Sequence, residues 1–371
     1  MGKKKNKKNK KEKKAKKLVD PIPSVAYIEP DQDCYWNAIP LGLTSNADGD
    51  ILPIYWYLND QNLYSDDYKT IPSTSFLIAG GTGSGKTVLE LDILSHLTKY
   101  PDKFQVVGID CKRVEFTSPK LKNQFNAVMK DSQSAASAIE TAKSIMMQRF
   151  KTMEKYQVNN VYKVAKKGVD VDYYELNCQK YQFDEILYVE VDLDEHARDY
   201  ARQKTLYPEG KKPLALTIET VYNDLNNGAK YYVNGQPITA KNIKKTSGTY
   251  NPKVVMLMID ELNELMCSDD YKSIDIIKTC MGSIARLGRA AGVHMVLGCQ
   301  RANGSTISSD LKNNIQLCCL LGGFDDMAST LMFEKDVSNY CKPQIKGRGF
   351  IGSGNEIIET QIYGGEYRRF L

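Results

Sequence analysis

The chain has 371 residues and an apolar fraction of 42%, enough to bury the core of one large α/β domain or two smaller ones. Its apolar runs are short, such as 254–259, and fall well below the roughly 20 residues that a membrane helix needs. No secretory signal follows the start. We therefore expect a cytoplasmic protein without a transmembrane segment, whose contact with any membrane would be peripheral.

The formal net charge of +5 is unevenly distributed along the chain. Residues 1–17 hold eleven Lys and one Glu, which leaves 39 basic and 44 acidic residues in the remainder. The body is thus mildly acidic, and the self-repelling Lys-rich tail is predicted to be disordered. The tail either only solubilises the protein, or it binds nucleic acid or an anionic membrane surface without sequence specificity.

Cysteine and histidine usage limits the chemistry that is available. None of the nine cysteines forms a CxxC pair, and without a secretory signal this predicts a reducing compartment and buried thiols. Only three histidines are present, so the sequence offers few ligands for a zinc site and few bases for a histidine-based catalytic triad.

Taken in chain order, the sequence begins after the tail with a small β-rich lead-in over 18–75. The next four predicted elements alternate between strand and helix: a buried strand at 76–79, a helix at 88–97, a strand at 104–109 and a long helix at 132–156.

Residues 157–252 differ in composition, because they are polar and hold eleven of the 23 tyrosines. The Asn234–Gly235 pair between short apolar stretches predicts a tight β-hairpin. We interpret this segment as an inserted subdomain. Its tyrosines could stack on nucleic-acid bases, but ordinary packing is the favoured interpretation.

The alternation then resumes, so 76–156 and 253–371 are predicted to form one α/β domain around the insertion. Its later elements are a strand at 254–259, a helix at 274–289, strands at 293–297 and 316–321, and a closing hairpin of 349–351 with 356–363. Alternating strands and helices predict a mostly parallel sheet that is covered on both faces.

The segment GGTGSGKT at 80–87 fits the GxxxxGK[ST] pattern of a phosphate-binding loop. Its glycines let backbone N–H groups surround the phosphates, and the following helix directs its positive end at the same anion. Lys86 is expected to reach the β- and γ-phosphates of ATP, and the Thr87 hydroxyl to bind Mg²⁺. A glycine-rich turn is the alternative, but a strand before and a helix after favour the phosphate loop. The predicted nucleotide-binding residues are Gly80, Gly81, Thr82, Gly83, Ser84, Gly85, Lys86, Thr87 and Val88.

The segment VVMLMIDE at 254–261 supplies the acidic partners of this loop. A buried strand that ends in Asp-Glu places both carboxylates at the carboxyl edge of the sheet. Asp260 is predicted to hold Mg²⁺ through water, and Glu261 to act as the base for the attacking water. Solvent-exposed acids are the alternative, which the neighbouring phosphate loop disfavours.

Three further polar residues follow or precede the strand at 293–297. Gln300 could sense the γ-phosphate or position water, although a turn glutamine is also plausible. Arg286 and Arg289 lie late on the preceding helix. Either could stabilise transition-state charge in a neighbouring subunit, or simply complement the helix C-terminus.

Together these segments resemble the FtsK/SpoIIIE family of ring-forming, DNA-pumping ATPases. The similar segments follow the family's order: 39–58, 75–89 (SFLIAGGTGSGKTVL), 108–116 (GIDCKRVEF), 254–266 (VVMLMIDELNELM), 283–301 (SIARLGRAAGVHMVLGCQR) and 347–352. The segment 283–301 is the most specific of these, since generic P-loop proteins lack it.

The resemblance implies a RecA-like P-loop fold and assigns Lys86 and Thr87 to ATP and Mg²⁺. It also implies Asp260 as metal partner, Glu261 as catalytic base and Gln300 as phosphate sensor. Arg289 becomes the preferred arginine finger, acting in trans across a subunit boundary.

The expected assembly is a homo-oligomeric, hexameric ring with double-stranded DNA in its pore. The loop at 301–314 could face this pore, with Arg301 and Lys312 as candidate DNA contacts, or it could be a solvated loop. Compared with septal translocases, we expect neither a membrane-spanning N-terminus nor an appended winged-helix domain, and 157–252 is longer than expected. The chain thus looks like a minimal soluble relative of the kind that phages and other mobile elements carry.

The sequence therefore predicts an ATP-driven translocase of double-stranded DNA, used in genome packaging, conjugative transfer or segregation of a mobile element. Two other functions stay open. One is a protein-secretion ATPase, because related domains also push polypeptides. The other is a nucleotide-gated DNA-binding module with negligible turnover.

Overall fold

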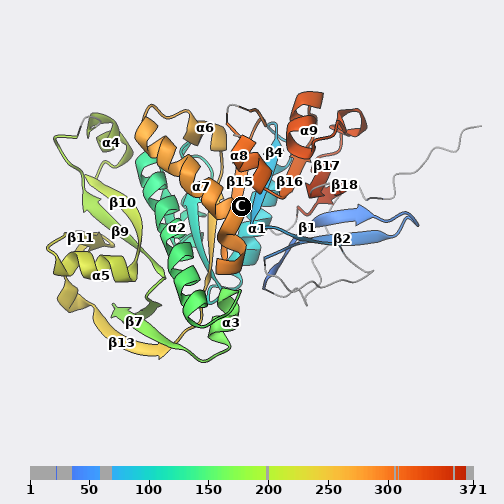
Figure 1. The fold of residues 1–371 in the computed structure, drawn as a ribbon. Helices are drawn as coiled ribbons and strands as arrows, with labels where there is room; N and C mark the ends of the chain where they lie inside the picture. Colours follow the sequence, from blue (N-terminus) through green and yellow to red (C-terminus); the bar gives the residue numbers. More distant parts are fainter. Residues whose placement is uncertain are drawn as a thin grey trace, which may run out of the picture.

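The computed structural model describes residues 22, 36–58, 69–197, 200–304, 306–307, 309–353 and 356–364. An 11-stranded sheet forms its centre (Figure 1). Six adjacent strands of this sheet are all parallel. In spatial order they are β16 (Leu317–Leu321), β4 (Ser75–Gly80), β15 (Val293–Cys299), β14 (Val254–Ile259), β5 (Phe104–Ile109) and β6 (Ala127–Met129). The prediction of an α/β fold with a mostly parallel sheet is confirmed.

Antiparallel strands extend the sheet beyond β16. They are β17 (Arg348–Ser353), β18 (Glu356–Ile362), β1 (Ala38–Ser45) and β2 (Ile51–Tyr57), with β3 (Lys69–Pro72) running parallel to β2 at the edge. Because β18 pairs with both β17 and β1, the lead-in strands continue the central sheet. The Lys-rich tail at 1–17 and most of 18–35 lie outside the described residues.

Helices cover both faces of the parallel strands. Neighbouring residues Leu77 and Ile78 of β4 belong to different apolar clusters, as expected when side chains alternate across a strand. The Leu77 face packs against α2 (Ser132–Lys155), α6 (Leu262–Met266), α7 (Tyr271–Ala291) and α8 (Ser309–Asn314). The Ile78 face packs against α1 (Lys86–Thr98) and against β1 and β2. A further helix, α9 (Asp326–Phe333), follows β16.

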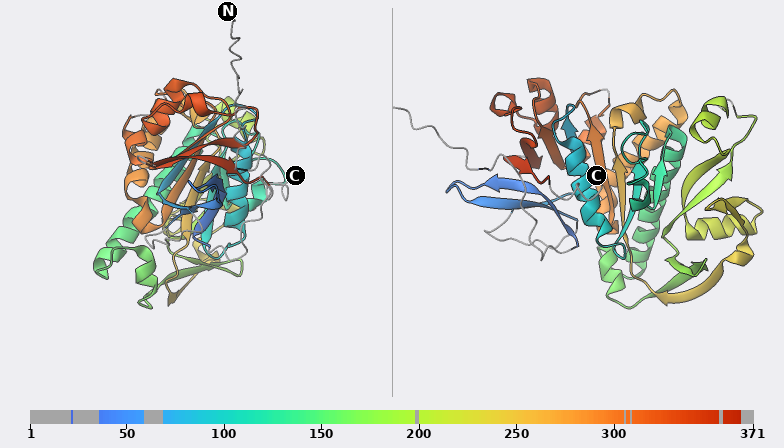
Figure 2. Two further views of the ribbon diagram at one scale, coloured as in Figure 1. Left: turned by 90° about the vertical axis from the view of Figure 1, so that its right-hand side faces the viewer. Right: turned by 180° about the vertical axis from the view of Figure 1, so that it is seen from behind.

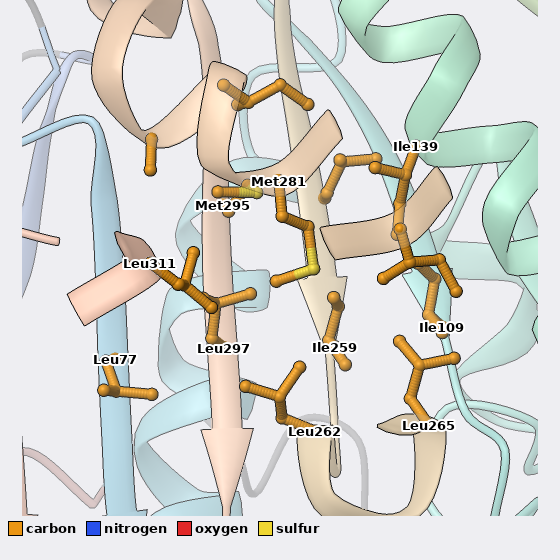
Figure 3. Packing of buried hydrophobic residues seen from close by; sticks show 14 of the residues in the cluster. Leu77, Ile109, Ile139, Ile259, Leu262, Leu265, Met281, Met295, Leu297 and Leu311 are labelled. Carbon is orange, nitrogen blue, oxygen red and sulfur yellow. The ribbon is translucent and has the colours of Figure 1, made fainter. Parts of the chain in front are cut away.

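The core on the Leu77 face is closely interdigitated. Figure 3 shows Met281 of α7 above Ile259 of β14, with the α6 leucines below them. These side chains are at most 1% exposed. Each fully buried side chain of this size contributes about 1.5–3 kcal/mol relative to an exposed one. The packing holds β14 rigidly, and this strand positions the acidic residues of the site.

The bounds of the two long helices follow from their caps. The Asp131 carboxylate accepts a hydrogen bond from the Ser134 N–H at 2.7 Å and starts α2. Asp270 caps α7 through Ser273 in the same way, so this helix begins three residues before the predicted Ile274. It ends at Gly292, whose φ of 65° is the left-handed conformation that glycine adopts most readily.

The described residues of the insertion, 157–197 and 200–252, form a separate layer beside the β6 edge, at the opposite end of the molecule from the β1–β2 hairpin (Figure 2). Its helices are α3 (Val161–Ala165), α4 (Tyr200–Leu206) and α5 (Ile218–Asn226). One sheet contains β10 (Lys211–Thr217), β9 (Ile186–Asp192), β11 (Tyr231–Val233) and β12 (Gln236–Ile238), and the other β13 (Lys244–Thr249), β7 (Asp170–Leu176) and β8 (Gln179–Gln182).

Two expectations for this segment are met. Asn234 and Gly235 have φ values of 50° and 74°, and they join β11 to β12 as the predicted hairpin. Tyr174 and Tyr250 are each 1% exposed, so these two tyrosines pack inside the protein.

The apolar character of the helices and the burial of the thiols bear on two further expectations. Within the described residues, no helix has both the length and the apolar character to cross a membrane. The thiols are not uniformly buried as expected, because Cys178 and Cys267 are exposed. The cysteines of the central strands, Cys299, Cys318 and Cys319, are buried.

His294 of β15 predicts a pH-dependent stability. Its ring is fully buried, its Nδ1 lies 3.0 Å from the Thr74 carbonyl oxygen, and burial lowers its pKa from the usual 6.5 to about 4. The unfolded chain therefore takes up a proton at a higher pH than the fold does. The stability from neutral His294 is present above pH 6.5 and is lost as the pH falls toward 4.

We expect this group to remove about 2 kcal/mol of unfolding free energy between pH 7 and 4.5. The measurement is urea unfolding of the wild type and of His294→Gln at several pH values in this range. Other titrating groups affect both proteins equally, so the difference between their pH slopes isolates His294. Parallel slopes would contradict the prediction.

Candidate nucleotide-binding site

The phosphate loop connects the carboxyl end of β4 to the first turn of α1. Gly85 precedes the helix with a φ of 109°, a conformation that side chains rarely adopt. The loop closes on itself through the Ser84 N–H, which donates to the Gly81 carbonyl oxygen at 3.0 Å. The free N–H groups at the start of α1 thereby face the loop, which is the arrangement that binds phosphate anions.

A pocket of about 640 Å³ opens at this loop. The loop and the start of α1 form one wall, and the carboxyl-terminal segment forms another. The lining residues are Gly80, Gly81, Thr82, Gly83, Gly85, Lys86, Thr87, Val88, Glu115, Gln300, Lys346, Gly347, Gln361, Ile362, Tyr363 and Gly364. All but Ser84 of the predicted nucleotide-binding residues line this pocket; Ser84 is buried behind it.

The carboxyl-terminal wall was not anticipated from the sequence. It is attached to the phosphate loop by the Gly347 N–H, which donates to the Ser84 carbonyl oxygen at 3.0 Å. The Ile362 N–H in turn donates to the Gly347 carbonyl oxygen at 3.0 Å. Ile362 and Tyr363 thus offer an apolar surface near Val88, next to the polar phosphate loop.

Lys86 is 8% exposed and lies among carboxylates. Its Nζ lies 3.1 and 3.2 Å from the two Glu90 oxygens, 3.1 Å from Asp260 Oδ1 and 2.8 Å from the Asp260 carbonyl oxygen. Burial by itself lowers the pKa of Lys86, but the two carboxylates outweigh burial and the pKa is raised. The ammonium group is therefore charged at neutral pH.

The acidic pair at the end of β14 lies where the sequence predicted. Asp260 contacts Lys86, and its pKa is raised chiefly by burial, which Lys86 opposes. Glu261 is 5% exposed and is held on both carboxylate oxygens. Its Oε1 accepts the Gln300 N–H at 3.1 Å, and its Oε2 accepts Lys112 Nζ at 3.0 Å. These contacts fix the direction in which the carboxylate points.

Gln300 lines the pocket and is exposed, so its side chain can reach a bound ligand. Arg289 does not lie at this pocket. Its neighbour Gly288 packs against Thr74, which precedes β4, whereas the phosphate loop follows the other end of β4. The length of β4 separates the two places by about 20 Å.

Like Asp260 and Glu261, the remaining predicted residues do not line the pocket of their own chain. Arg286 is exposed on α7, whereas Arg289 is half-buried. Arg301 is exposed, and its carbonyl oxygen accepts a hydrogen bond from Asn263 Nδ2 at 3.3 Å. Lys312 lies on α8, so the end of the segment expected to be a loop is helical.

Sequence reasoning assigned no role to three charged residues of the site. Lys112 follows the carboxyl end of β5, and Glu115 lines the pocket with a pKa raised by burial and then by Asp260. Glu90 is 1% exposed, and burial raises its pKa to about 8. Its spacing of four residues from Lys86 was a usable signal, since such residues are neighbours on a helix.

Comparison with known proteins identifies the family. Residues 57–303, more than half of the chain, match the sequence profile of the FtsK/SpoIIIE family. The chain belongs to the FtsK/SpoIIIE family. The family and the fold together make it a P-loop ATPase domain, and ATP is the nucleotide that the family implies.

Relatives of known function include proteins named DNA translocase FtsK. The protein from Clostridium tetani is 24% identical over 259 residues, which is 68% of this chain and 24% of that protein. The protein from Helicobacter pylori strain J99 is 35% identical over 103 residues, which is 27% of this chain and 12% of that protein. The segment matched by this FtsK/SpoIIIE-family chain thus spans less than a quarter of the length of either relative.

Solved structures share the fold. The pCW3 conjugation coupling protein TcpA, in its monomer form with ATPγS, gives a TM-score of 0.58 at 19% identity, covering 92% of this chain and 70% of that one. ATPases 2 and 3 of EssC from Geobacillus thermodenitrificans give a TM-score of 0.56 at 14% identity, covering 95% and 52%. At these identities the likeness concerns the fold alone.

Proposed function

We propose that this chain hydrolyses ATP to move double-stranded DNA through a ring of its own copies. The observation that carries hydrolysis is the position of Glu261, a buried carboxylate fixed on both oxygens and linked to the pocket through Gln300. The relatives named DNA translocase FtsK support DNA as the substrate.

The residues at the phosphate loop fit a magnesium ion that is shared with the nucleotide. Among the described residues, no group of three or more His, Cys, Asp and Glu side chains could hold a metal ion alone. Mg²⁺ commonly takes one or two protein oxygens together with phosphates and water. The hydroxyl of Thr87, a residue that lines the pocket, and the carboxylate of Asp260, which contacts Lys86, match this need. The ion would neutralise charge on the phosphates.

In this proposal each residue has a separate task. The loop N–H groups and Lys86 hold the phosphates, Glu261 accepts a proton from the attacking water, and Gln300 contacts the γ-phosphate. Arginine would come from the next subunit. The location of Arg289 far from its own pocket is compatible with action in trans. The more exposed Arg286 on the same helix is the alternative source of this arginine.

A ring requires each pocket to lie near a subunit boundary, and we propose six subunits on the family resemblance. DNA would pass through the pore, where Arg301 and Lys312 are the candidate contacts. Because phosphates repeat uniformly along DNA, movement would be largely independent of sequence.

The decisive test is the ATPase rate of the full chain with and without duplex DNA at low salt. We expect duplex DNA to raise the rate severalfold, and the stimulation to weaken as salt increases. A variant with the eleven tail lysines replaced by glutamine serves as the control for nonspecific attraction. It should bind DNA more weakly but remain DNA-stimulated if the pore is the motor's contact.

Three outcomes would contradict the translocase proposal. An ATPase rate that DNA leaves unchanged would exclude it. Stimulation by a protein substrate in place of DNA would favour a secretion ATPase. Tight ATP binding without phosphate release would indicate a nucleotide-gated binding module.

A further inference from the structure

Glu90 is a buried acid for which the proposed reaction has no use. It does not line the pocket, and it is 1% exposed on α1. A site for a triphosphate is expected to collect positive charge, yet here two carboxylates surround one lysine. Asp260 has a role in the proposed reaction as a ligand of Mg²⁺, whereas Glu90 has none. A charge that is costly to bury calls for a specific partner, and this partner is Lys86.

The geometry leaves Lys86 fully engaged. An ammonium group has three N–H donors, and protein oxygens lie within 3.2 Å of Lys86 Nζ at four positions. Two of these four oxygens belong to Glu90. Phosphate oxygens need at least one of the same donors. Binding of a nucleotide therefore requires Lys86 to give up part of its contact with Glu90 or Asp260.

A second element makes room for this contact. Gly298 of β15 faces the cluster, and a Cβ atom there would lie 2.1 Å from Glu90 Oε1 and 2.3 Å from the Asp260 carbonyl oxygen. Both distances are too short for any side chain. The contact therefore depends on helix α1, strand β14 and the absence of a side chain in β15, and not only on the helical spacing of Glu90 and Lys86.

We propose that Glu90 is a positioning residue that competes with the nucleotide phosphates for the Lys86 ammonium and thereby weakens nucleotide binding. The inference rests on the proposed function, because it takes Lys86 as the phosphate ligand. In a motor, such competition favours release of the product ADP, since the buried carboxylate recaptures Lys86 as the nucleotide leaves.

The test is the dissociation constant for MgADP, measured by calorimetry on the full-length protein. Measurement at pH 9.5, more than one unit above the pKa of about 8 that burial gives Glu90, keeps its carboxylate charged. Glu90→Gln keeps the shape of the side chain and removes the charge. We expect it to tighten MgADP binding about tenfold, because charged hydrogen bonds are the strong ones. Glu140→Gln, at an exposed position of α2, removes the same charge elsewhere and should change nothing.

A double-mutant cycle with Lys86→Ala decides whether Glu90 acts through Lys86. Lys86→Ala alone should weaken MgADP binding, and adding Glu90→Gln to it should then have no effect. Unchanged or weaker binding in Glu90→Gln, or the same tightening without Lys86, would overturn the inference.

The two proposals fail in different ways. If Lys86→Ala leaves MgADP binding intact, the nucleotide site itself is wrongly assigned. If Lys86→Ala weakens binding but Glu90→Gln does not tighten it, only the role of Glu90 is wrong. Thermal unfolding of each variant checks that it is folded. Glu90→Met, which is also uncharged and of similar length, replaces the amide variant if that variant does not fold, with the same expected result.

Discussion

Glu261→Gln is expected to lower the ATP turnover rate by about 100-fold or more while leaving ATP binding nearly unchanged. Removal of a general base typically costs 10²–10⁴-fold, roughly, in rate. The glutamine keeps the size of the side chain and can still accept the Gln300 N–H through its carbonyl oxygen. It cannot accept a proton from water. Phosphate release under saturating ATP and binding of ATPγS are the two measurements.

A matched control is needed, because the substitution also disturbs the contact between Glu261 Oε2 and Lys112 Nζ at 3.0 Å. Lys112→Met removes that contact and keeps the carboxylate. We expect it to lower turnover only severalfold. If Lys112→Met were as damaging as Glu261→Gln, the ion pair and not the base would be the important feature.

Lys86→Ala is expected to affect ATP binding as well as turnover, unlike Glu261→Gln. It removes a phosphate ligand, so we expect ATP binding to be weakened and turnover to be lost while the fold is retained. Two variants at one site would thus separate binding from chemistry. Substantial turnover in either variant would refute the role that we assign to that residue.

The sequence predicted the central part of this site because its signals are local. Each predicted chemical residue there directly follows a buried strand: the phosphate loop follows β4, Asp260 and Glu261 follow β14, and Gln300 follows β15. The carboxyl ends of parallel strands meet at one edge of a sheet, so a strand pattern alone brings these residues together. These residues could therefore be placed together without any knowledge of contacts between distant segments.

The rest of the site depends on contacts between distant segments. The pocket wall at Ile362 exists because β18 pairs with β1, more than 300 residues earlier in the chain, and no periodicity in the sequence encodes that pairing. The same holds for Lys112 and Glu261, which are far apart in sequence and contact each other. Glu90 differs, since its spacing from Lys86 was visible. Only the structure shows, however, that Gly298 leaves space for the two to meet.

The insertion was the least predictable part of the fold. Its strand β13, for example, is mostly exposed and polar, so it shows no alternation between apolar and polar residues. The hairpin turn at Asn234–Gly235 was predictable, because a turn with left-handed backbone at two successive residues favours this pair. A buried ion pair is one of the contacts that join the insertion to the central domain, and such a pair leaves no periodic signal.

That ion pair joins Arg149 of α2 to Asp184 of the insertion. Arg149 Nε donates to Asp184 Oδ2 at 2.8 Å, and both side chains are 0% exposed. The same carboxylate oxygen accepts the Tyr250 hydroxyl at 2.7 Å. The guanidinium also donates at 2.8 Å to the carbonyl oxygens of Ala291 and Lys253, next to α7 and β14. One arginine thus connects the insertion to the ends of two core elements.

The electrostatics show how strongly the pair is coupled. Burial by itself lowers the pKa of Arg149, but Asp184 more than offsets burial and the pKa is raised. Removing either partner leaves a charge in a place that water does not reach. Breaking a buried pair in this way costs about 3–5 kcal/mol, much more than the pair contributes relative to apolar residues.

We therefore expect Asp184→Asn to lower the free energy of unfolding by about 3–5 kcal/mol, measured by urea denaturation. Asp172→Asn is the matched control within the same insertion. Its partner Lys245 lies at 2.7 Å, but both side chains are about half exposed, so the loss should stay within about 1 kcal/mol. Equal losses in the two variants would contradict a special role of the buried pair.

Replacing both partners tests the mechanism of the loss. In Arg149→Met with Asp184→Leu no charge remains buried, so the double variant should be less destabilised than the sum of its single variants. The carbonyl oxygens of Ala291 and Lys253 lose their donor in the double variant, and a residual cost of about 1–3 kcal/mol for each is expected. If the losses were additive, the carbonyl contacts of Arg149 and not its pairing with Asp184 would hold the insertion against the central domain.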